Sequence, residues 1–282
     1  MIIDIHTHIF PDKIAASTLK VLSGKSHTQP FTDGTLNGLL NSMKIFHVDV
    51  SIILPVATKP EQVTKINDNA AQINEKFSNA GIISFASIHP DFENCRAELS
   101  RVKNLGFKGI KIHPVYQNTN LDDKKFLRIF DSAAELDLIV ITHAGLDIGF
   151  PRIVSCTPKM ARHVVEEIGA FKFILAHMGG WKSWDEVADE LSDVNVFIDT
   201  AFSAGKIPNN YDYYSTDEVQ MLDAENFMKL YKIFSADKIL FGTDSPWDSQ
   251  GTPIDFINAL PIADADKNKI FSGNAKKLLS LT

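Results

Sequence analysis

The chain has little cysteine, no long apolar run and no cluster of positive charge. Its two cysteines, Cys95 and Cys156, lie far apart and form no Cys-x-x-Cys pair, which favours free thiols in a reducing compartment. No apolar stretch approaches the roughly 20 residues that a membrane span requires. At most two basic residues stand in a row and the net charge is −7, so nothing indicates a nucleic-acid partner or an anionic membrane surface.

A glycine-rich phosphate-binding loop is also missing after the first predicted strand, where the sequence reads HTHIFPDK. That absence argues against an open, doubly wound sheet. The first residues run directly into a strand without a visible signal peptide, so we expect a cytoplasmic protein. Hydrophobic residues make up 44% of the chain, which is ample for a full core. We see no internal repeat, low-complexity tract or linker, and we predict one domain over residues 1–282.

Eight short, β-branched apolar runs alternate with amphipathic helical patterns. Most of the runs are continuously hydrophobic, which is typical of strands in a parallel sheet that is buried on both faces. The predicted strands span residues 2–9, 48–56, 82–90, 107–114, 138–145, 171–178, 194–201 and 238–245. Strand and helix repeated eight times predict an α/β fold, a single (β/α)8 TIM barrel.

Two predicted connections are longer than a barrel needs. They are residues 10–34, after the first strand, and residues 202–221, after the seventh. Both leave the face where the strands end, and long loops there often form lids over a substrate, although solvated insertions have the same pattern. We therefore expect a distorted barrel with extra loops at its C-terminal face.

Histidines and one aspartate stand at the ends of several predicted strands. His6 and His8 are two residues apart in one strand, so their side chains should share a face with Asp4. A His-x-His pair alone is weak evidence, but the carboxyl ends of barrel strands converge on one point. Neutral imidazoles and a carboxylate there are suited to a divalent metal ion. The predicted metal ligands are His6, His8, His143, His177 and Asp244.

Lys111 and His113 share a face of the fourth predicted strand, inside the barrel. Burying an unpaired ammonium group is costly, so Lys111 needs a partner. Three partners remain open: a substrate carboxylate, a carbamate that bridges two metal ions, or an interior acid such as Asp4. The predicted catalytic residues are Asp244, His177 and Lys111.

Four residues near the predicted barrel mouth are candidates for substrate binding. His113 follows the fourth strand and could contact a substrate. Arg152 could hold a carboxylate with its planar fork or be a surface charge. Trp181 and Trp247 could enclose a planar substrate or pack at the barrel rim.

Taken in order, HTH, GIKIHP, ITHAG, LAHMGG and FGTDSPW resemble the amidohydrolase superfamily. The chain is most similar to the amidohydrolase-related family, which includes aminocarboxymuconate-semialdehyde decarboxylase and related aromatic-acid decarboxylases. The resemblance covers nearly the whole chain and implies a (β/α)8 barrel with a metal held by His6, His8, His143 and Asp244. It also implies that His177 activates or orients a water, whereas in binuclear relatives the matching histidine binds a second metal. Lys111 departs from the pattern of the mononuclear decarboxylases.

The resemblance leaves the reaction open, because the family contains hydrolases, lactonases among them, as well as carboxy-lyases. We predict a divalent metal, with zinc preferred to manganese and one ion preferred to two. Such a metal lowers the pKa of a bound water to about 7. Because the lysine inside the fourth strand favours hydrolysis, we first predict a hydrolase of a small carboxylate-bearing or cyclic amide, ester or lactone substrate. The alternatives are a non-oxidative decarboxylase of an aromatic or unsaturated acid, and a catalytically silent metal- or ligand-binding barrel. A homodimer is common in the family.

Overall fold

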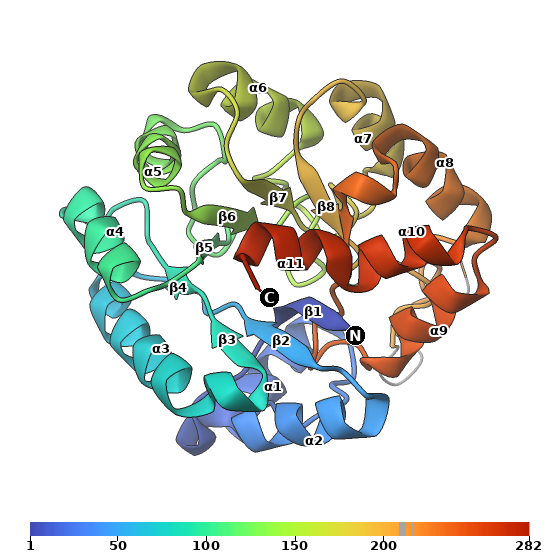
Figure 1. Ribbon diagram of the computed structural model, residues 1–282, viewed down its shortest axis with the longest axis horizontal. Coiled ribbons are helices and arrows are strands. Elements are labelled where there is room, and N and C mark those ends of the chain that lie inside the picture. Colours follow the sequence, from blue (N-terminus) through green and yellow to red (C-terminus); the bar gives the residue numbers. More distant parts are fainter. Residues whose placement is uncertain (209–212, 216, 282) are drawn as a thin grey trace.

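Parallel strands ringed by helices form the body of the protein in the computed structural model (Figure 1). The structure describes residues 1–208, 213–215 and 217–281. Its strands are β1 (Ile3–Thr7), β2 (Val50–Ile53), β3 (Ile82–Ser84), β4 (Ala86–Ser87), β5 (Gly109–Ile112), β6 (Ile139–Thr142), β7 (Phe173–Leu175), β8 (Phe197–Asp199) and β9 (Ile239–Leu240). They pair in parallel and in sequence order, in one sheet of β1 to β3 and another of β4 to β9.

Helices follow nearly every strand. They are α1 (Asp12–Ser26), α2 (Leu36–Phe46), α3 (Val63–Phe77), α4 (Cys95–Asn104), α5 (Lys124–Glu135), α6 (Pro158–Ile168), α7 (Trp184–Leu191), α8 (Ala224–Phe234), α9 (Gly251–Ala259), α10 (Asp264–Asn268) and α11 (Asn274–Leu279). Shorter helical turns are η1 (Pro60–Gln62), η2 (Ser78–Ala80), η3 (Ala236–Lys238) and η4 (Lys269–Gly273). Within the described ranges, none of these helices has both the length and the apolar character needed to cross a lipid bilayer.

The two sheets join into a closed barrel. Strands β3 and β4 lie in one predicted run, residues 82–90, and Phe85 separates them. The Phe85 N–H donates to the Ile53 carbonyl at 2.9 Å, which keeps this run paired with β2. On the other side, the Ile5 N–H donates to the Phe241 carbonyl at 3.0 Å and the Asp244 N–H donates to the His6 carbonyl at 2.8 Å. These backbone bonds link the last strand to β1. The predicted (β/α)8 barrel is therefore confirmed.

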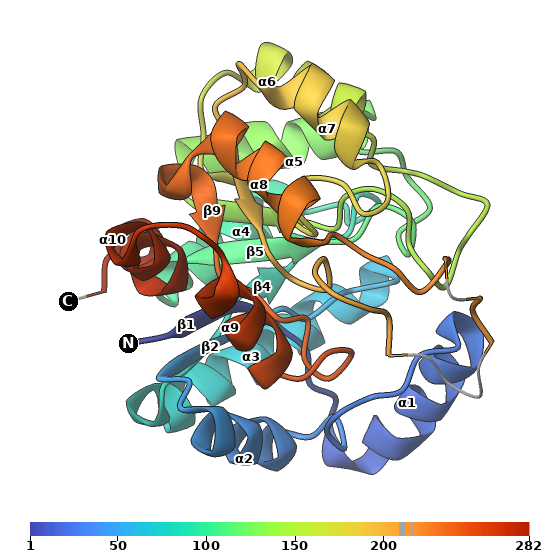
Figure 2. The same cartoon turned by 90° about the vertical axis from the view of Figure 1, so that its right-hand side faces the viewer.

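The lower half of the barrel is filled with aliphatic side chains and closed by α11, which crosses the centre of the ring in Figure 1. One cluster contains Ile3, Ile5, Ile52, Leu54, Phe85, Ile139, Ile141, Ile174, Leu240, Ala275 and Leu279. The space left among these residues is only about 10 Å³, no more than one water needs. Figure 2 shows α10 and both chain termini at this end, and α1 with several long loops at the other.

The direction of three side chains in β1 differs from the prediction. Strict alternation placed Asp4 on the same face as His6, and Ile3 and Ile5 towards the helices. Instead, Ile3 and Ile5 belong to the interior cluster, and Asp4 accepts hydrogen bonds from Thr243 and Gln250. The register of β1 against β2 shifts between Asp4 and Thr7, and such a bulge breaks the alternation of faces.

We expected the first long connection to be a loop, but it contains a helix, α1. Ala15 and Leu19, four residues apart, are both buried and anchor one side of this helix. Pro11 lies just before its first turn, where a missing N–H is tolerated. In the second connection, Tyr211 lies outside the described residues, whereas Ile207 and Val219 pair by a backbone hydrogen bond of 2.8 Å.

Candidate metal centre and active-site cavity

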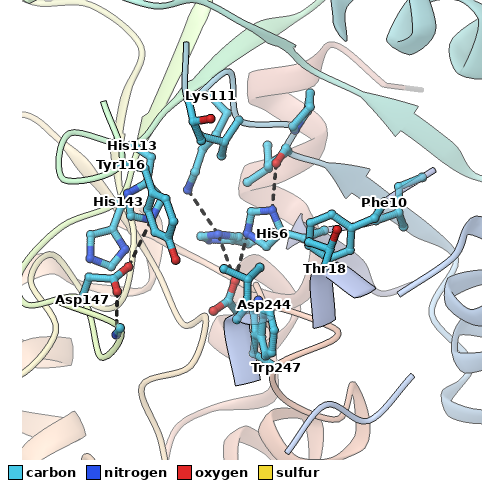
Figure 3. Close-up of a pocket in the computed structure, with 18 of the residues that line it drawn as sticks. His6, Phe10, Thr18, Lys111, His113, Tyr116, His143, Asp147, Asp244 and Trp247 are labelled. Carbon is cyan, nitrogen blue, oxygen red and sulfur yellow. Dashed lines mark hydrogen bonds and ion pairs between the residues drawn. The ribbon is translucent and has the colours of Figure 1, made fainter. Parts of the chain in front are cut away.

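A cavity of about 770 Å³ opens where the barrel strands end (Figure 3). Its walls contain every predicted metal ligand, together with Lys111, His113, Trp181 and Trp247. The predicted ligands, Lys111 and His113 come from β1 and β5 and from the segments that directly follow β1, β5, β6, β7 and β9. The expected convergence of strand ends on one point is therefore present.

Three of the predicted ligands form a compact group suited to one divalent ion. The Asp244 Oδ1 atom lies 3.1 Å from His8 Nε2 and 3.4 Å from His6 Nε2. Two ligands that each lie about 2.1 Å from a tetrahedral zinc are about 3.4 Å apart. The separations of these donor atoms therefore fit a shared metal ion.

Hydrogen bonds fix which nitrogen of each histidine faces that group. His6 Nδ1 lies 2.8 Å from Asp199 Oδ2, and His8 Nδ1 lies 2.8 Å from the Leu54 carbonyl. A carboxylate or carbonyl oxygen only accepts, so the proton is on Nδ1 and the Nε2 lone pair of each ring faces the group. Asp199, at the end of β8, was missed from the sequence, although its acidic side chain interrupts an otherwise apolar run.

The charge states around the group also favour cation binding. Burial, followed by the charge of Lys111, lowers the pKa of His6 well below its usual value, so its imidazole is neutral. Burial alone would raise the pKa of Asp244, but the hydrogen bond with His8 and the nearby His6 hold it at about 2. His6 and Asp244 are therefore a neutral imidazole and a carboxylate at neutral pH, the protonation states in which these side chains ligate metals.

The other two predicted ligands lie beside this group. His143 Nδ1 is 3.0 Å from His177 Nε2, and His177 Nδ1 donates to the Ala201 carbonyl at 2.8 Å. His143 also forms a second set of closely spaced donor atoms with His113 and Asp147. The 3.0 Å separation fits a hydrogen bond between the rings, and it equally fits two ligands of one further ion.

The chain turns sharply at two of these strand ends. His177 has φ 60° and Asp244 has φ 66°, both in the left-handed region that residues with a side chain seldom occupy. Such conformations cluster at functional sites. Leu175, two residues before His177, packs against the helices and does not line the cavity.

Lys111 is fully buried, and its Nζ lies 3.3 Å from His6 Nε2. Burial lowers the pKa of Lys111 to about 8, although the charges of Asp199 and Asp244 oppose the shift. Asp4, one of the partners left open by the sequence, instead binds Thr243 and Gln250. The ammonium group therefore lies at the metal-binding group, where it can meet a substrate anion or, as a neutral amine, form a carbamate.

The predicted substrate-binding residues divide into two groups. His113, Trp181 and Trp247 line the cavity, whereas Arg152 is exposed and is not among the lining residues. The loop after β6 carries Arg152 outward. The number of residues between β6 and Arg152 does not reveal this direction.

Two further polar residues of the cavity were missed. The Asp147 Oδ2 atom lies 3.4 Å from His113 Nε2, and burial raises the pKa of Asp147 to about 6. The ring of Tyr116 meets that of His113 edge-on, with 4.5 Å between their centroids. Both lie three or four residues after a predicted strand-end histidine, a spacing that would have signalled them.

Gly145, in the ITHAG segment, lets the loops after β6 and β7 meet. A Cβ atom there would lie 2.1 Å from the Trp181 nitrogen, and Gly145 has φ +84°. We expect Gly145→Ala to lower the free energy of unfolding by at least about 3 kcal/mol, from the left-handed backbone and the forced shift of packed neighbours. Urea denaturation measures this difference.

Gly106→Ala is the matched control, since Gly106 has φ +87° but no atom within 4 Å of an added Cβ. It should lower the free energy of unfolding by only about 1 kcal/mol. Equal losses in the two variants would contradict a steric role for the contact between Gly145 and Trp181.

The chain belongs to the amidohydrolase family. The sequence model of that family matches residues 3–281. It is therefore an enzyme of that family, as the ordered strand-end segments indicated. A comparison with functionally curated proteins finds no match.

Solved structures of low sequence identity share the fold over nearly their full length. A 2,6-dihydroxybenzoate decarboxylase from Rhizobium is 19% identical with a TM-score of 0.71, covering 99% of this chain and 98% of that one. A dihydroxybenzoic acid decarboxylase from Polaromonas sp. JS666, with bound manganese and the inhibitor 2-nitroresorcinol, is 16% identical with a TM-score of 0.69, covering 99% and 97%. A 5-carboxyvanillate decarboxylase from Novosphingobium aromaticivorans DSM 12444, complexed with manganese and 4-hydroxy-3-methoxy-5-nitrobenzoic acid, is 15% identical with a TM-score of 0.71, covering 100% and 96%.

Proposed function

We propose that this protein is a metal-dependent decarboxylase of an aromatic or unsaturated carboxylic acid. The observation that carries the proposal is the group of His6, His8 and Asp244, whose donor atoms converge at the mouth of an amidohydrolase barrel. Several of the similar solved structures, including the three described above, are decarboxylases. This reverses the order predicted from the sequence, which placed hydrolysis first.

His6, His8 and Asp244 would hold the metal, with His143 and His177 next to them. Manganese, which two of the similar structures contain, suits this nitrogen and oxygen donor set as zinc does. Bound there, the ion supplies positive charge that orients a substrate carboxylate and polarises its oxygens.

Decarboxylation replaces a carbon–carbon bond by a carbon–hydrogen bond. A proton adds to the ring or alkene carbon that carries the carboxylate, carbon dioxide leaves, and the electrons of the broken bond restore the double bond. Each turnover consumes one proton, which stays in the new carbon–hydrogen bond. We assign its transfer to Asp244, which lines the cavity and, because its pKa is about 2, would first take up a proton from the substrate or from solvent. His177 and His143, 3.0 Å apart, are the neighbouring groups that we assign to the delivery of the next proton. The ammonium of Lys111 stabilises negative charge on the substrate in the buried site.

A second candidate is the hydrolase, which one observation favours. Lys111, with a pKa of about 8, lies 3.3 Å from His6 and is the residue that could bridge two ions as a carbamate. The pair of His143 and His177 would then hold the second ion. In that arrangement the substrate would be a lactone, ester or amide, and Lys111 would no longer be available to bind a carboxylate.

Metal analysis and product assays separate these functions. Protein purified without chelator or added metal is analysed for its elements, and we expect about one ion per chain. The loaded protein is then tested for carbon dioxide release from dihydroxybenzoates and carboxyvanillate, and for ring opening of a lactone panel. Carbon dioxide release without lactone opening is the expected result. About two ions with lactone opening alone would replace the decarboxylase by the hydrolase. No bound ion, even after incubation with zinc or manganese, would refute both.

A further inference from the structure

We propose that the cavity accepts an acid with an apolar substituent, an alkyl or aryl extension that reaches from the metal-binding group to helix α1. This inference deepens the proposed decarboxylase function and rests on it for the position of the carboxylate. The cavity measures about 770 Å³. Sites for drug-sized ligands measure about 300–1,000 Å³, so a single-ring acid would leave most of this space to water.

Helix α1 gives this extra space an apolar wall. Ile14, Thr18 and Leu22 recur every four residues, lie on one face of α1 and line the cavity. Ile14 is 49% exposed, although the buried Ala15 beside it fixes the helix in place. An aliphatic side chain that borders a cavity but remains half-exposed gains stability when an apolar ligand covers it.

The wall continues on both sides of α1. Leu54, directly after β2, and Ile66 of α3 line the same space, as does Phe10 just before α1. The segment around Ile66 also contributes polar lining residues, which are Thr58, Glu61, Gln62, Lys65 and Asn69. Figure 3 shows Phe10 and Thr18 to one side of His6, and His113, Tyr116 and Asp147 to the other. Polar groups of a substrate ring therefore suit the side of Asp147, and an apolar substituent suits the side of α1.

The position of the metal-binding group sets where the substituent is attached. With its carboxylate at His6, His8 and Asp244, a benzoate directs the ring carbon opposite the carboxylate away from that group. A chain on this carbon can reach Thr18 and Leu22 of α1. Acids with a chain there are the substrate class that we infer.

Binding is tested with manganese-loaded protein and benzoate, para-propylbenzoate and para-hexylbenzoate. These acids lack the ring hydroxyl that activates the ring for protonation, so calorimetry measures Kd without turnover. We expect para-hexylbenzoate to bind about 60-fold more tightly than para-propylbenzoate, because the two acids differ by three methylene groups at about fourfold each. Thr18→Trp fills the space beside α1 and should reduce this ratio to less than about fivefold. Val21→Trp, at an outward position of the same helix that is 58% exposed, is the matched control and should keep the ratio.

The binding ratios decide the proposal of an apolar extension, and the release of carbon dioxide decides the proposal of a decarboxylase. A ratio near one in the wild-type protein, or a ratio that Thr18→Trp leaves unchanged, would overturn the apolar extension whatever the reaction is. A 60-fold ratio that only Thr18→Trp removes would support it. If hydroxybenzoates with the same chains then release no carbon dioxide, the decarboxylase proposal fails and the binding result stands.

Discussion

Asp244→Asn is expected to lower kcat for decarboxylation by at least about 1,000-fold, because the substitution removes both a charged metal ligand and the proposed proton carrier. The amide keeps the size of the carboxylate, so the barrel should stay folded. The measurement is the initial rate of carbon dioxide release at saturating substrate, together with the thermal unfolding temperature.

Asp248→Asn is a suitable control for that change, since Asp248 lies four residues further on and is buried outside the cavity lining. Burial raises the pKa of Asp248 to about 7, so its carboxyl group is partly neutral near pH 7 and a neutral amide resembles the protonated form. This variant should keep its turnover rate. Turnover of Asp244→Asn within tenfold of the wild-type value would show that our assignment of the proton transfer is wrong.

The double variant His6→Ala, His8→Ala is expected to lose its metal. Two of the three donors in the compact group are removed, and one carboxylate cannot hold a transition metal against water. In the wild-type protein, a metal at about 1,000 times its Kd adds about 4 kcal/mol to the free energy of unfolding. Elemental analysis and thermal unfolding with and without manganese therefore report the loss in two independent ways.

His163→Ala is the control for metal loss, because His163 is exposed on α6. It should retain the wild-type metal content and the wild-type response to manganese. Retention of metal by the double variant would mean that His143, His177 and Lys111, or His113, His143 and Asp147, form the principal site.

Much of the barrel could be predicted because buried parallel strands leave a direct signature. Each predicted apolar run contains a strand, and the five predicted metal ligands at the strand ends line the cavity, whereas His89 and Asp199 at two other strand ends do not. The failures occur where a local irregularity overrides the period of a strand. The bulge after Asp4 changed the faces of its neighbours, and the sequence does not signal it.

Residues that act across strands were the ones missed. Asp199 is far from His6 in sequence but accepts its Nδ1 proton, and only the closed ring brings the two strands close enough. Asp147 reaches His113 from the loop after another strand. The reaction could not be read from the ligands, because hydrolysis and decarboxylation use the same residues. The weight given to Lys111 favoured hydrolysis, whereas we propose decarboxylation.

The closure of the lower end of the barrel by α11 has a kinetic consequence. Aliphatic side chains fill the barrel below the cavity and leave about 10 Å³ among the described residues there, so molecules cannot pass through that end. In the proposed reaction, substrate, carbon dioxide and product would therefore all exchange through the mouth beside α1. We expect a product whose apolar chain still lies on α1 to inhibit competitively, and more strongly as that chain lengthens.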